Sequence, residues 1–291
     1  MTTLKIGTLA VIGVGLIGGS FAAALRRAGR VGRVLGAGRR PETLAQAVEL
    51  GLIDEAVTLK EAAARADLIF IAAPVGAFEA IFSEIAPHLG AKTIVTDGGS
   101  TKRNVIEAAR SGLGSRIAQF VPGHPMAGSH EKGPQAANPD LYTGRRVMLT
   151  PLVENHPLDI ATVQAAWQHC GANVVCIDPS QHDGAVAAVS HLPHWVAALF
   201  MQYITSGDDA VLKLETAGTG FRDFTRVAQG SPEMWRDIFM ANRDALLAEI
   251  ASLRQVMDRA EHALRDHDAV WLEDMLARAA QARADWPGGS K

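Results

Sequence analysis

The sequence is poor in cysteine, and neither sign of charge is in clear excess. Its 291 residues include two cysteines, Cys170 and Cys176, which are too few for a disulfide framework and fit a reducing cytoplasm. Neither has a CxxC neighbour or a nearby histidine cluster, so zinc binding at these cysteines is not indicated. With 28 basic and 31 acidic side chains the formal net charge is −3, which gives no reason to expect nucleic acid or an anionic membrane as a partner.

The N-terminal region also lacks the unbroken apolar run of a membrane span. Residues 6–25 are mostly apolar and follow Lys5, so a signal peptide or a span is one interpretation. However, glycines at positions 13, 15, 18 and 19 interrupt the run at the spacing of a tight turn, and no A-x-A cleavage site closes it. A strand, a glycine turn and a buried helix explain the segment better, so we expect a cytoplasmic protein without a membrane partner.

Short apolar runs alternate with helical stretches over the first 178 residues. The expected helices include residues 16–28, 76–89 and 159–170, and the expected strands are 8–13, 31–36, 67–74, 93–97, 117–121, 147–151 and 173–178. Several strands are continuous runs of Val, Ile, Leu and Ala, as in a sheet covered by helices on both faces. We therefore expect residues 1–178 to form an α/β Rossmann-type domain, a doubly wound parallel sheet.

After residue 178 the strand pattern stops. Residues 180–206 read as one long helix that contains Pro193, and residues 217–224 read as a loop punctuated by glycine. Ser231 and Pro232 then open another helix, as N-cap and first helical residue. We therefore expect residues 179–291 to form an all-α helical domain.

Six apolar residues recur in steps of four and three along the last long helical stretch. They are Leu246, Ile250, Leu253, Met257, Ala260 and Leu264. Such a heptad seam needs another helix to cover it. A helix of the same chain is one interpretation. Because few other helices are available for that purpose, we favour helices shared across a homodimer.

A glycine-rich motif, GVGLIG at residues 13–18, stands between the first strand and the first helix. Gly13 permits the turn, Gly15 lets the backbone approach a pyrophosphate, and Gly18 lets helix and strand pack closely. The N–H groups around Leu16 and Ile17, at the helix N-terminus, then face the phosphates. A GxGxxG motif alone is a weak signal, but its position inside a βαβ unit predicts a dinucleotide site.

The residues after the second strand indicate which dinucleotide binds. NAD enzymes usually carry an acidic residue there for the ribose 2′-hydroxyl, whereas this strand ends in Gly38, Arg39 and Arg40. A carboxylate would repel a 2′-phosphate, and guanidinium groups bind it bidentately. The two arginines are otherwise solvated loop charges. With the acid missing as well, we favour NADP over NAD as the cofactor.

Two polar clusters follow predicted strands, and a third lies on a helix. DGGSTK at residues 97–102 contains Ser100, and GHPMAGS at residues 123–129 contains His124. Ligands of open α/β sheets bind outside the carboxyl ends of the strands, so both side chains should face the nicotinamide. Pro125 keeps His124 out of helical geometry, as on a rigid loop. In SHLPH at residues 190–194, His191 and His194 share one helix face.

The order of these motifs, followed by GFRDFTR at residues 220–226 and MWRD at 234–237, resembles the prephenate and arogenate dehydrogenase family. The similarity runs from residue 7 to about residue 265. It implies a Rossmann-type domain, an all-helical dimerisation domain, and oxidative decarboxylation of prephenate or arogenate with NAD(P) in tyrosine biosynthesis.

The resemblance also implies roles for single residues. His124 matches the catalytic histidine that pairs with the ring hydroxyl of the substrate, and Ser100 matches a serine that hydrogen-bonds the same region. His191 and His194 match histidines that line the substrate pocket. Arg226 matches the arginine that holds a substrate carboxylate. A neutral imidazole, with an ordinary pKa of about 6.5, is suited to accept the hydroxyl proton during hydride transfer.

Further expected contacts surround these residues. Trp235 matches a tryptophan that reaches the pocket from the partner subunit, and Pro74 is expected against the cofactor at a strand end. Asp223 belongs to the same motif as Arg226. Ser129, with the residues after it, and Arg222 lie where the family varies, beside the substrate side chain. The choice between prephenate and arogenate therefore stays open.

Alternative interpretations of the same residues also stay open. A β-hydroxyacid-type dehydrogenase would share the two-domain plan, but its lysine is missing from the stretch that holds His191 and His194. An NADPH-binding dimer without turnover is a second alternative. The two histidines could instead bind a metal together with His182 and Asp183, although hydride transfer needs none, and we expect no metal. Arg226 could be a structural ion-pair partner, and Trp235 a core residue.

Overall fold

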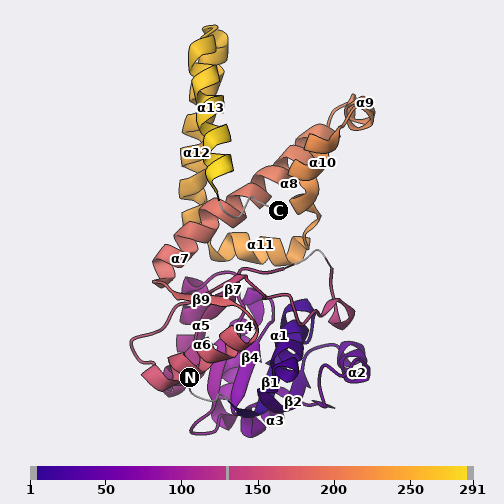
Figure 1. Ribbon diagram of the computed structural model, residues 1–291, viewed down its shortest axis with the longest axis vertical. Helices are drawn as coiled ribbons and strands as arrows, with labels where there is room; N and C mark the ends of the chain where they lie inside the picture. Colours follow the sequence, from indigo (N-terminus) through magenta and orange to yellow (C-terminus); the bar gives the residue numbers. More distant parts are fainter. Residues whose placement is uncertain (1–4, 129–130, 287–291) are drawn as a thin grey trace. The chain divides into compact units, whose positions relative to one another are not determined.

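The computed structural model describes residues 5–128 and 131–286, so Ser129 lies outside the described residues. The chain divides into two compact units, Met1–Arg243 and Asp244–Lys291. The first unit contains both sheets and the helices up to α11 (Pro232–Ala241), and the second unit contains most of α12 (Arg243–Arg265) and all of α13 (Ala269–Asp285) (Figure 1).

A six-stranded parallel sheet forms the centre of the first unit, in the order β3-β2-β1-β4-β5-β6. The strands are β1 Ile6–Ile12, β2 Val31–Ala37, β3 Glu55–Ala56, β4 Leu68–Ile71, β5 Ile94–Asp97 and β6 Phe120–Val121. The order reverses direction between β1 and β4, which is the switch point where ligands of such sheets bind. The Rossmann-type fold predicted from the sequence is confirmed.

The last strands leave this sheet, which differs from the predicted single doubly wound sheet. β7 (Gly123–Pro125) pairs antiparallel with β8 (Arg146–Leu149), and β8 pairs parallel with β9 (Asn173–Cys176). Pro122 follows β6 and has no N–H for a strand ladder, so the main sheet ends there. His124 consequently lies in a short strand of the second sheet, and its expected place on a loop is wrong.

Helices cover both faces of the large sheet (Figure 1). They are α1 Leu16–Arg27, α2 Pro41–Glu49, α3 Leu59–Arg65, α4 Phe78–Ile85, α5 Arg103–Leu113 and α6 Pro157–His169. Side chains alternate along each strand, so Leu9 and Val11 of β1 belong to one buried cluster, and Ala10 and Ile12 belong to the other. This double burial explains why a central strand such as β4 is apolar at every position.

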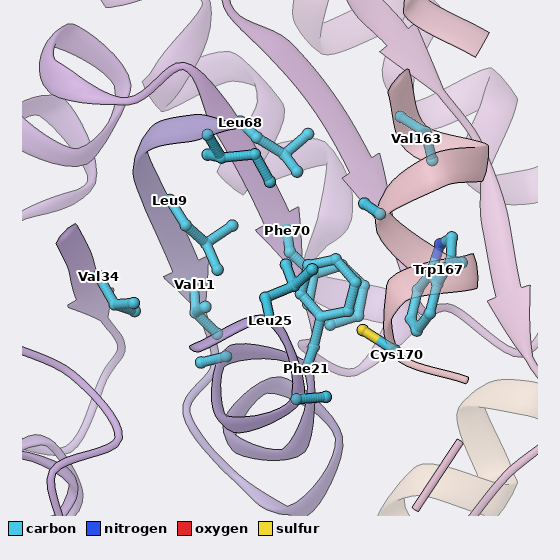
Figure 2. Packing of buried hydrophobic residues seen from close by; sticks show 14 of the residues in the cluster. Leu9, Val11, Phe21, Leu25, Val34, Leu68, Phe70, Val163, Trp167 and Cys170 are labelled. Atoms are coloured by element: carbon cyan, nitrogen blue, oxygen red, sulfur yellow. The ribbon is translucent and has the colours of Figure 1, made fainter. Parts of the chain in front are cut away.

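Aromatic rings pack in the buried cluster that contains Leu9 and Val11, on the face of the sheet that α1 and α6 cover (Figure 2). Phe21 of α1 lies with its ring centroid 4.4 Å from that of Phe70 and 4.5 Å from that of Trp167. Tyr142 packs edge-on against Trp167 at 5.0 Å. These rings fix α1 against the sheet, and with it the position of the glycine-rich turn that precedes the helix.

The predicted helix over residues 180–206 contains a widened turn. α7 (Pro179–Val186) passes into a π-helical segment, η5 (Ala187–His191), and then into α8 (Leu192–Thr205). The Leu192 N–H donates to the Ala187 carbonyl five residues earlier. Pro193 has no N–H to continue an α-helical ladder, and a π-type turn accommodates that loss. Such bulges frequently lie at functional sites, and this one carries His191.

Three shorter helical segments complete the first unit. They are α9 Ala210–Glu215, α10 Thr219–Thr225 and the 3₁₀ turn η6 Arg226–Gln229, which precedes α11. The loop predicted over residues 217–224 is therefore wrong for most of its length. Gly218 serves as the N-cap of α10 and Gly220 stands in its first turn, where glycine is tolerated.

One continuous helical run, Pro179–Thr205, has the length and apolar composition of a membrane span within the described part of the chain. The run nevertheless buries three histidines and Asp183, and two of those histidines and Asp183 are hydrogen-bonded within the first unit. These polar side chains are the ones that define the candidate site below.

The second unit is a helical hairpin in which the seam predicted from the sequence is partly exposed. His267, with a φ of 54°, and the Asp268 cap of α13 form the turn. Met257 and Leu264 of the seam are 61% and 64% exposed. The described chain therefore does not cover the seam at these two positions.

Candidate active site

The glycine-rich turn after β1 is too crowded for side chains at two positions. Gly13 has a φ of +96°, and a Cβ there would lie 2.5 Å from the carbonyl oxygen of Ala72. A Cβ on Gly18 would collide with the Gly13 carbonyl and lie 2.7 Å from Cγ1 of Val11. Only glycine at both positions lets α1 start so close to β1 and β4.

The middle glycine faces open space. A Cβ on Gly15 would meet no other atom within 4 Å. α1 begins at the next residue, Leu16, and its first turn, which includes Ile17, has no acidic side chain. The N–H groups and the dipole of a helix N-terminus attract phosphate. The residues present therefore fit the pyrophosphate of a dinucleotide.

Two exposed arginines follow the carboxyl end of β2. Arg39 lies in the loop, and Arg40 is the N-cap residue of α2. Over residues 5–128 and 131–286, neither guanidinium forms an ion pair. Pro74 follows β4 at the same edge of the sheet, just before the 3₁₀ turn η1 (Val75–Ala77). A 2′-phosphate at this edge would find positive charge that the protein itself does not neutralise.

A fully buried ion pair joins the end of β5 to the start of β7. The Lys102 ammonium contacts the Asp97 carboxylate and donates to the Gly123 carbonyl at 2.7 Å, while Asp97 accepts the Gly123 N–H at 2.9 Å. Burial raises the pKa of Asp97 and lowers the pKa of Lys102, and their mutual attraction opposes both shifts. Because both backbone groups of Gly123 are held, the next residue, His124, is fixed at the carboxyl edge of the sheet.

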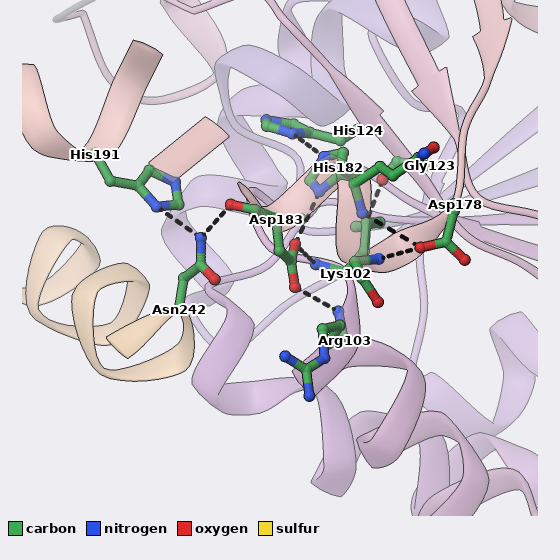
Figure 3. A network of polar contacts seen from close by, with 12 residues as sticks. Lys102, Arg103, Gly123, His124, Asp178, His182, Asp183, His191 and Asn242 are labelled. Atoms are coloured by element: carbon green, nitrogen blue, oxygen red, sulfur yellow. Dashed lines mark hydrogen bonds and ion pairs between the residues drawn. The ribbon is translucent and has the colours of Figure 1, made fainter. Parts of the chain in front are cut away.

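His124 begins a chain of buried hydrogen bonds (Figure 3). Its Nδ1 lies 2.9 Å from Nε2 of His182, and Nδ1 of His182 lies 2.8 Å from Oδ1 of Asp183. The Asp183 carboxylate also accepts the N–H groups of Lys102 and Arg103 at the start of α5, at 2.8 and 2.9 Å. The chain thus connects β7, α7 and α5.

For uncharged imidazole rings, these contacts determine which nitrogen carries the proton. An ionised carboxylate only accepts hydrogen bonds, so His182 donates to Asp183 through Nδ1. Nε2 of His182 is then an acceptor, and His124 donates to it through its own Nδ1. The remaining nitrogen of His124, Nε2, is left unprotonated and able to accept a proton.

The surroundings also keep His124 uncharged before a reaction. Burial lowers the pKa of His124 well below its ordinary value, and the neighbouring His182, Lys102 and His191 lower it further. Burial alone would raise the pKa of Asp183, but the hydrogen bonds from His182 and from two backbone N–H groups hold it below its ordinary value. A neutral base is therefore linked through His182 to an ionised carboxylate.

His191 and His194 are buried beyond this chain. Nδ1 of His191 lies 3.2 Å from Nδ2 of Asn242, the residue that follows α11, and Nδ2 donates to the Asp183 carbonyl at 2.8 Å. His194 stacks on Trp235, with ring centroids 3.6 Å apart and planes at 15°. Burial lowers the pKa of both histidines to about 4. Trp235 thus packs on a histidine of its own chain, and its expected contact with a partner's pocket stays a prediction.

Arg226 lines a cavity of about 370 Å³. Arg222, Thr225 and Gln229 line it on the side of α10 and η6, and Ala198 and Met201 of α8 line the opposite side. The predicted histidines are not among its lining residues, and the exposed Asp223 is not either. The structure gathers the histidines into one network and leaves Arg226 beside Arg222.

Ser100 lies between Asp97 and Lys102, in the loop that the buried ion pair spans. The neighbouring Gly99 N–H donates to the Asp97 carboxylate at 2.8 Å, which fixes the backbone beside the serine. Ser100 is partly buried, and no hydrogen bond to its side chain is formed within the described residues. Its hydroxyl is thus not committed to a protein partner within that part of the chain.

Several residues of the network were not predicted as site residues. They are Asp97, Lys102, His182, Asp183 and Asn242. His182 and Asp183 were considered only as metal ligands. Within residues 5–128 and 131–286, however, no group of three or more His, Cys, Asp or Glu side chains is placed so that it could hold a metal ion. A signal was present: His182 and Asp183 are adjacent in a long helical stretch that is rich in Ala, Val and Leu, and a buried Asp requires partners.

Comparison with known proteins decides the family. Residues 21–176 match the nucleotide-binding domain of prephenate dehydrogenase, and residues 178–278 match its dimerization domain. The chain belongs to the prephenate dehydrogenase family. The resemblance expected from the sequence motifs is confirmed.

Family members resemble this chain over most of its length. Prephenate dehydrogenase of Bacillus subtilis is 35% identical, over 90% of this chain and 71% of the relative. The crystal structure of prephenate dehydrogenase from A. aeolicus, in complex with hydroxyphenyl propionate and NAD+, matches with a TM-score of 0.91 at 31% identity and covers 97% of this chain and 99% of that one. Synechocystis arogenate dehydrogenase matches with a TM-score of 0.81 at 31% identity, over 95% of this chain and 99% of that one.

Proposed function

We propose that this chain is a cytoplasmic, NADP-dependent dehydrogenase that oxidatively decarboxylates prephenate or arogenate in tyrosine biosynthesis. The observation that carries the proposal is the buried chain from Asp183 through His182 to His124, which leaves Nε2 of His124 unprotonated. That nitrogen belongs to a residue fixed at the carboxyl edge of a nucleotide-binding sheet. A base at this edge is what dehydrogenation of a hydroxyl-bearing carbon requires.

The residues of the chain divide the proton chemistry among them. When bound, the nicotinamide supplies the hydride acceptor. Nε2 of His124 accepts the proton of the ring hydroxyl, and its Nδ1–H stays bonded to His182. The positive charge that develops on His124 is stabilised through His182 by the ionised Asp183. Ser100 donates a second hydrogen bond to the same hydroxyl region. The ring carboxylate leaves as carbon dioxide, its bonding electrons complete an aromatic ring, and Nε2 of His124 returns the proton to the phenolate oxygen, so that the phenol is released and the base is regenerated.

Fixed positive charge binds the dianionic substrate. Arg226 is assigned to a substrate carboxylate, because a guanidinium binds a carboxylate bidentately and Arg226 has no ion-pair partner within the described residues. His191, His194 and Trp235 form an aromatic wall for the ring. Ser129 and Asp223 are assigned to the substrate side chain, where prephenate and arogenate differ.

NADP is proposed over NAD on this chain's own residues. Arg39 and Arg40 are exposed and unpaired within the described residues, and no acidic residue stands at the end of β2. The related structure from A. aeolicus was solved with NAD+. Cofactor choice is therefore tested directly in the experiment below.

We also propose that the chain acts as a homodimer, with domains that divide near residue 178. A dimerization-domain match and the exposed Met257 and Leu264 of the heptad seam support this assembly. Light scattering after size exclusion should give twice the 30.9 kDa mass of one chain. A single-chain mass at micromolar concentration would contradict the dimer.

Initial rates at 340 nm test the function. Purified protein is combined with prephenate or arogenate and with NADP or NAD, four combinations in all. Turnover of at least one substrate with NADP, faster than with NAD, supports the proposal. Turnover only with NAD would overturn the assignment of Arg39 and Arg40 while leaving the chemistry intact. No turnover in any combination, from protein with a cooperative unfolding transition, would overturn the proposed function.

A further inference from the structure

The side chain of Asn242 joins His191 to the buried hydrogen-bond chain of His124, His182 and Asp183. It is 5% exposed and follows the last residue of α11. Its Nδ2 donates to the carbonyl of Asp183 at 2.8 Å and lies 3.2 Å from Nδ1 of His191 (Figure 3). The Asp183 carboxylate therefore holds His124 through His182, and the Asp183 carbonyl holds His191 through Asn242. Neither the family comparison nor the proposed chemistry assigns a role to Asn242.

The Asp183 carbonyl fixes the orientation of the Asn242 amide. A carbonyl oxygen only accepts hydrogen bonds, so the amide nitrogen and not the amide oxygen must face it. That nitrogen carries two hydrogens, and the second points to Nδ1 of His191. Nδ1 of His191 is then an acceptor. In the neutral ring, the proton must reside on the other nitrogen, Nε2.

His124 and His191, the two histidines linked to Asp183, are thus held as opposite tautomers. His124 keeps its proton on Nδ1 and presents an unprotonated Nε2, whereas His191 keeps its proton on Nε2 and presents a donor. Burial lowers the pKa of both rings below the ordinary value, so both are neutral near pH 7. The rings are also close enough for the charge of one to disfavour protonation of the other. One base and one neutral donor result from the same residue type.

We propose that Asn242 is a positioning residue that holds His191 as the Nε2–H tautomer, so that His191 donates a hydrogen bond to an oxygen of the substrate. The substrate contact rests on the proposed function, which assigns His191 to the pocket. The tautomer of His191 does not rest on the proposed function, because it follows from contacts within the protein. These two parts are therefore tested by separate measurements.

Nitrogen-15 NMR of histidine-labelled protein without ligand tests the tautomer. The chemical shifts of a neutral imidazole distinguish its protonated from its unprotonated nitrogen, and a His191→Gln variant assigns the ring. Wild type should show protonated Nε2 in His191. Asn242→Asp replaces the donor with an acceptor of the same size and should place a proton on Nδ1. A wild-type ring protonated on Nδ1, or an unchanged pattern in Asn242→Asp, would overturn the proposal whether or not the protein has activity.

Steady-state kinetics test the contact with substrate. Asn242→Leu should lower kcat/KM about tenfold, because a misoriented His191 loses one hydrogen bond to substrate. Asn155→Leu is the matched control, since the buried Asn155 amide donates to the carbonyls of Ala118 and Phe120 and forms no hydrogen bond with a histidine in the described residues. In a His191→Ala background the effect of Asn242→Leu should fall below about twofold. An effect of equal size with and without His191 would reduce Asn242 to a structural residue.

Discussion

Two groups of candidate site residues differ in how the protein holds them. The histidines at positions 124, 182 and 191 are buried, and each has a ring nitrogen bonded to a protein group. The arginines at positions 39, 40 and 226 are exposed and have no ion pair within the described residues. Groups whose partners are built into the fold are preorganised for chemistry. Groups whose charge is left unneutralised are suited to binding an anionic ligand. Changes in the first group should therefore lower kcat, and changes in the second should raise KM.

Removal of the base should have the largest effect. His124→Asn should reduce kcat about 10²- to 10⁴-fold, because general base catalysis contributes on that scale, while the affinity for NADPH stays near wild type. Rates at 340 nm and a fluorescence titration with NADPH measure the two quantities. The control is His156→Asn, an exposed N-cap of α6 where asparagine also caps well. Near-normal turnover of His124→Asn would remove His124 from the chemistry.

Loss of the carboxylate anchor should follow in size. Arg226→Ala should raise KM for the substrate about 10- to 100-fold, because a charge-assisted hydrogen bond contributes about 1.5–3 kcal/mol. Arg236→Ala is the matched control, since that exposed guanidinium pairs with Asp237 and does not line the cavity of Arg226. An unchanged KM in Arg226→Ala would contradict the assignment of this cavity to substrate binding.

Loss of the two arginines proposed to bind the 2′-phosphate should affect only one of the two cofactors. Replacing Arg39 and Arg40 together with Ala should raise KM for NADP about tenfold or more and leave KM for NAD nearly unchanged, because only NADP has the 2′-phosphate. Arg33→Ala controls for loss of an exposed guanidinium on β2, the strand that precedes the two arginines, where Arg33 pairs with Glu55. Equal losses for both cofactors would mean that the two arginines are only loop charges.

Acid should weaken the fold through the buried histidines. In the unfolded chain their pKa is about 6.5, whereas burial lowers the pKa of His191 and His194 to about 4 in the folded protein. Between these values the unfolded chain binds more protons, so stability present above pH 6.5 is lost as the pH falls toward 4. Melting temperatures measured across this range should decline, and His194→Gln should show a shallower decline. A melting temperature independent of pH there would contradict neutral burial.

The sequence predicted the features that depend on neighbouring residues. The glycine turn with Gly13 and Gly18, the apolar strands and the helix that begins at Pro232 all have local patterns, and the structure contains them. The second sheet was missed because three-residue β7 is too short for a pattern, and Pro122 separates it from β6. The glycines at 218 and 220 indicated a loop, but one caps α10 and the other is tolerated in its first turn.

The polar network could not be predicted from local patterns. His124 and His182 are 58 positions apart, and Asn242 lies 59 positions from Asp183. Their partnership depends on how α7 and α11 pack in the folded chain, and no spacing rule encodes that. The motifs identified His124 and His191 as candidates, but only the bonded neighbours distinguish a base from a donor.

A double-mutant cycle tests most directly whether the buried histidines act in catalysis and the exposed arginines act in binding. The kcat/KM values of His124→Asn, Arg226→Ala and the double variant are compared with wild type. Since no hydrogen bond or ion pair joins the two residues within the described part of the chain and they are assigned different tasks, their losses should multiply, which means that their free energies add within about 0.5 kcal/mol. A double variant no worse than His124→Asn alone would show that Arg226 acts through the histidine network and would contradict the account.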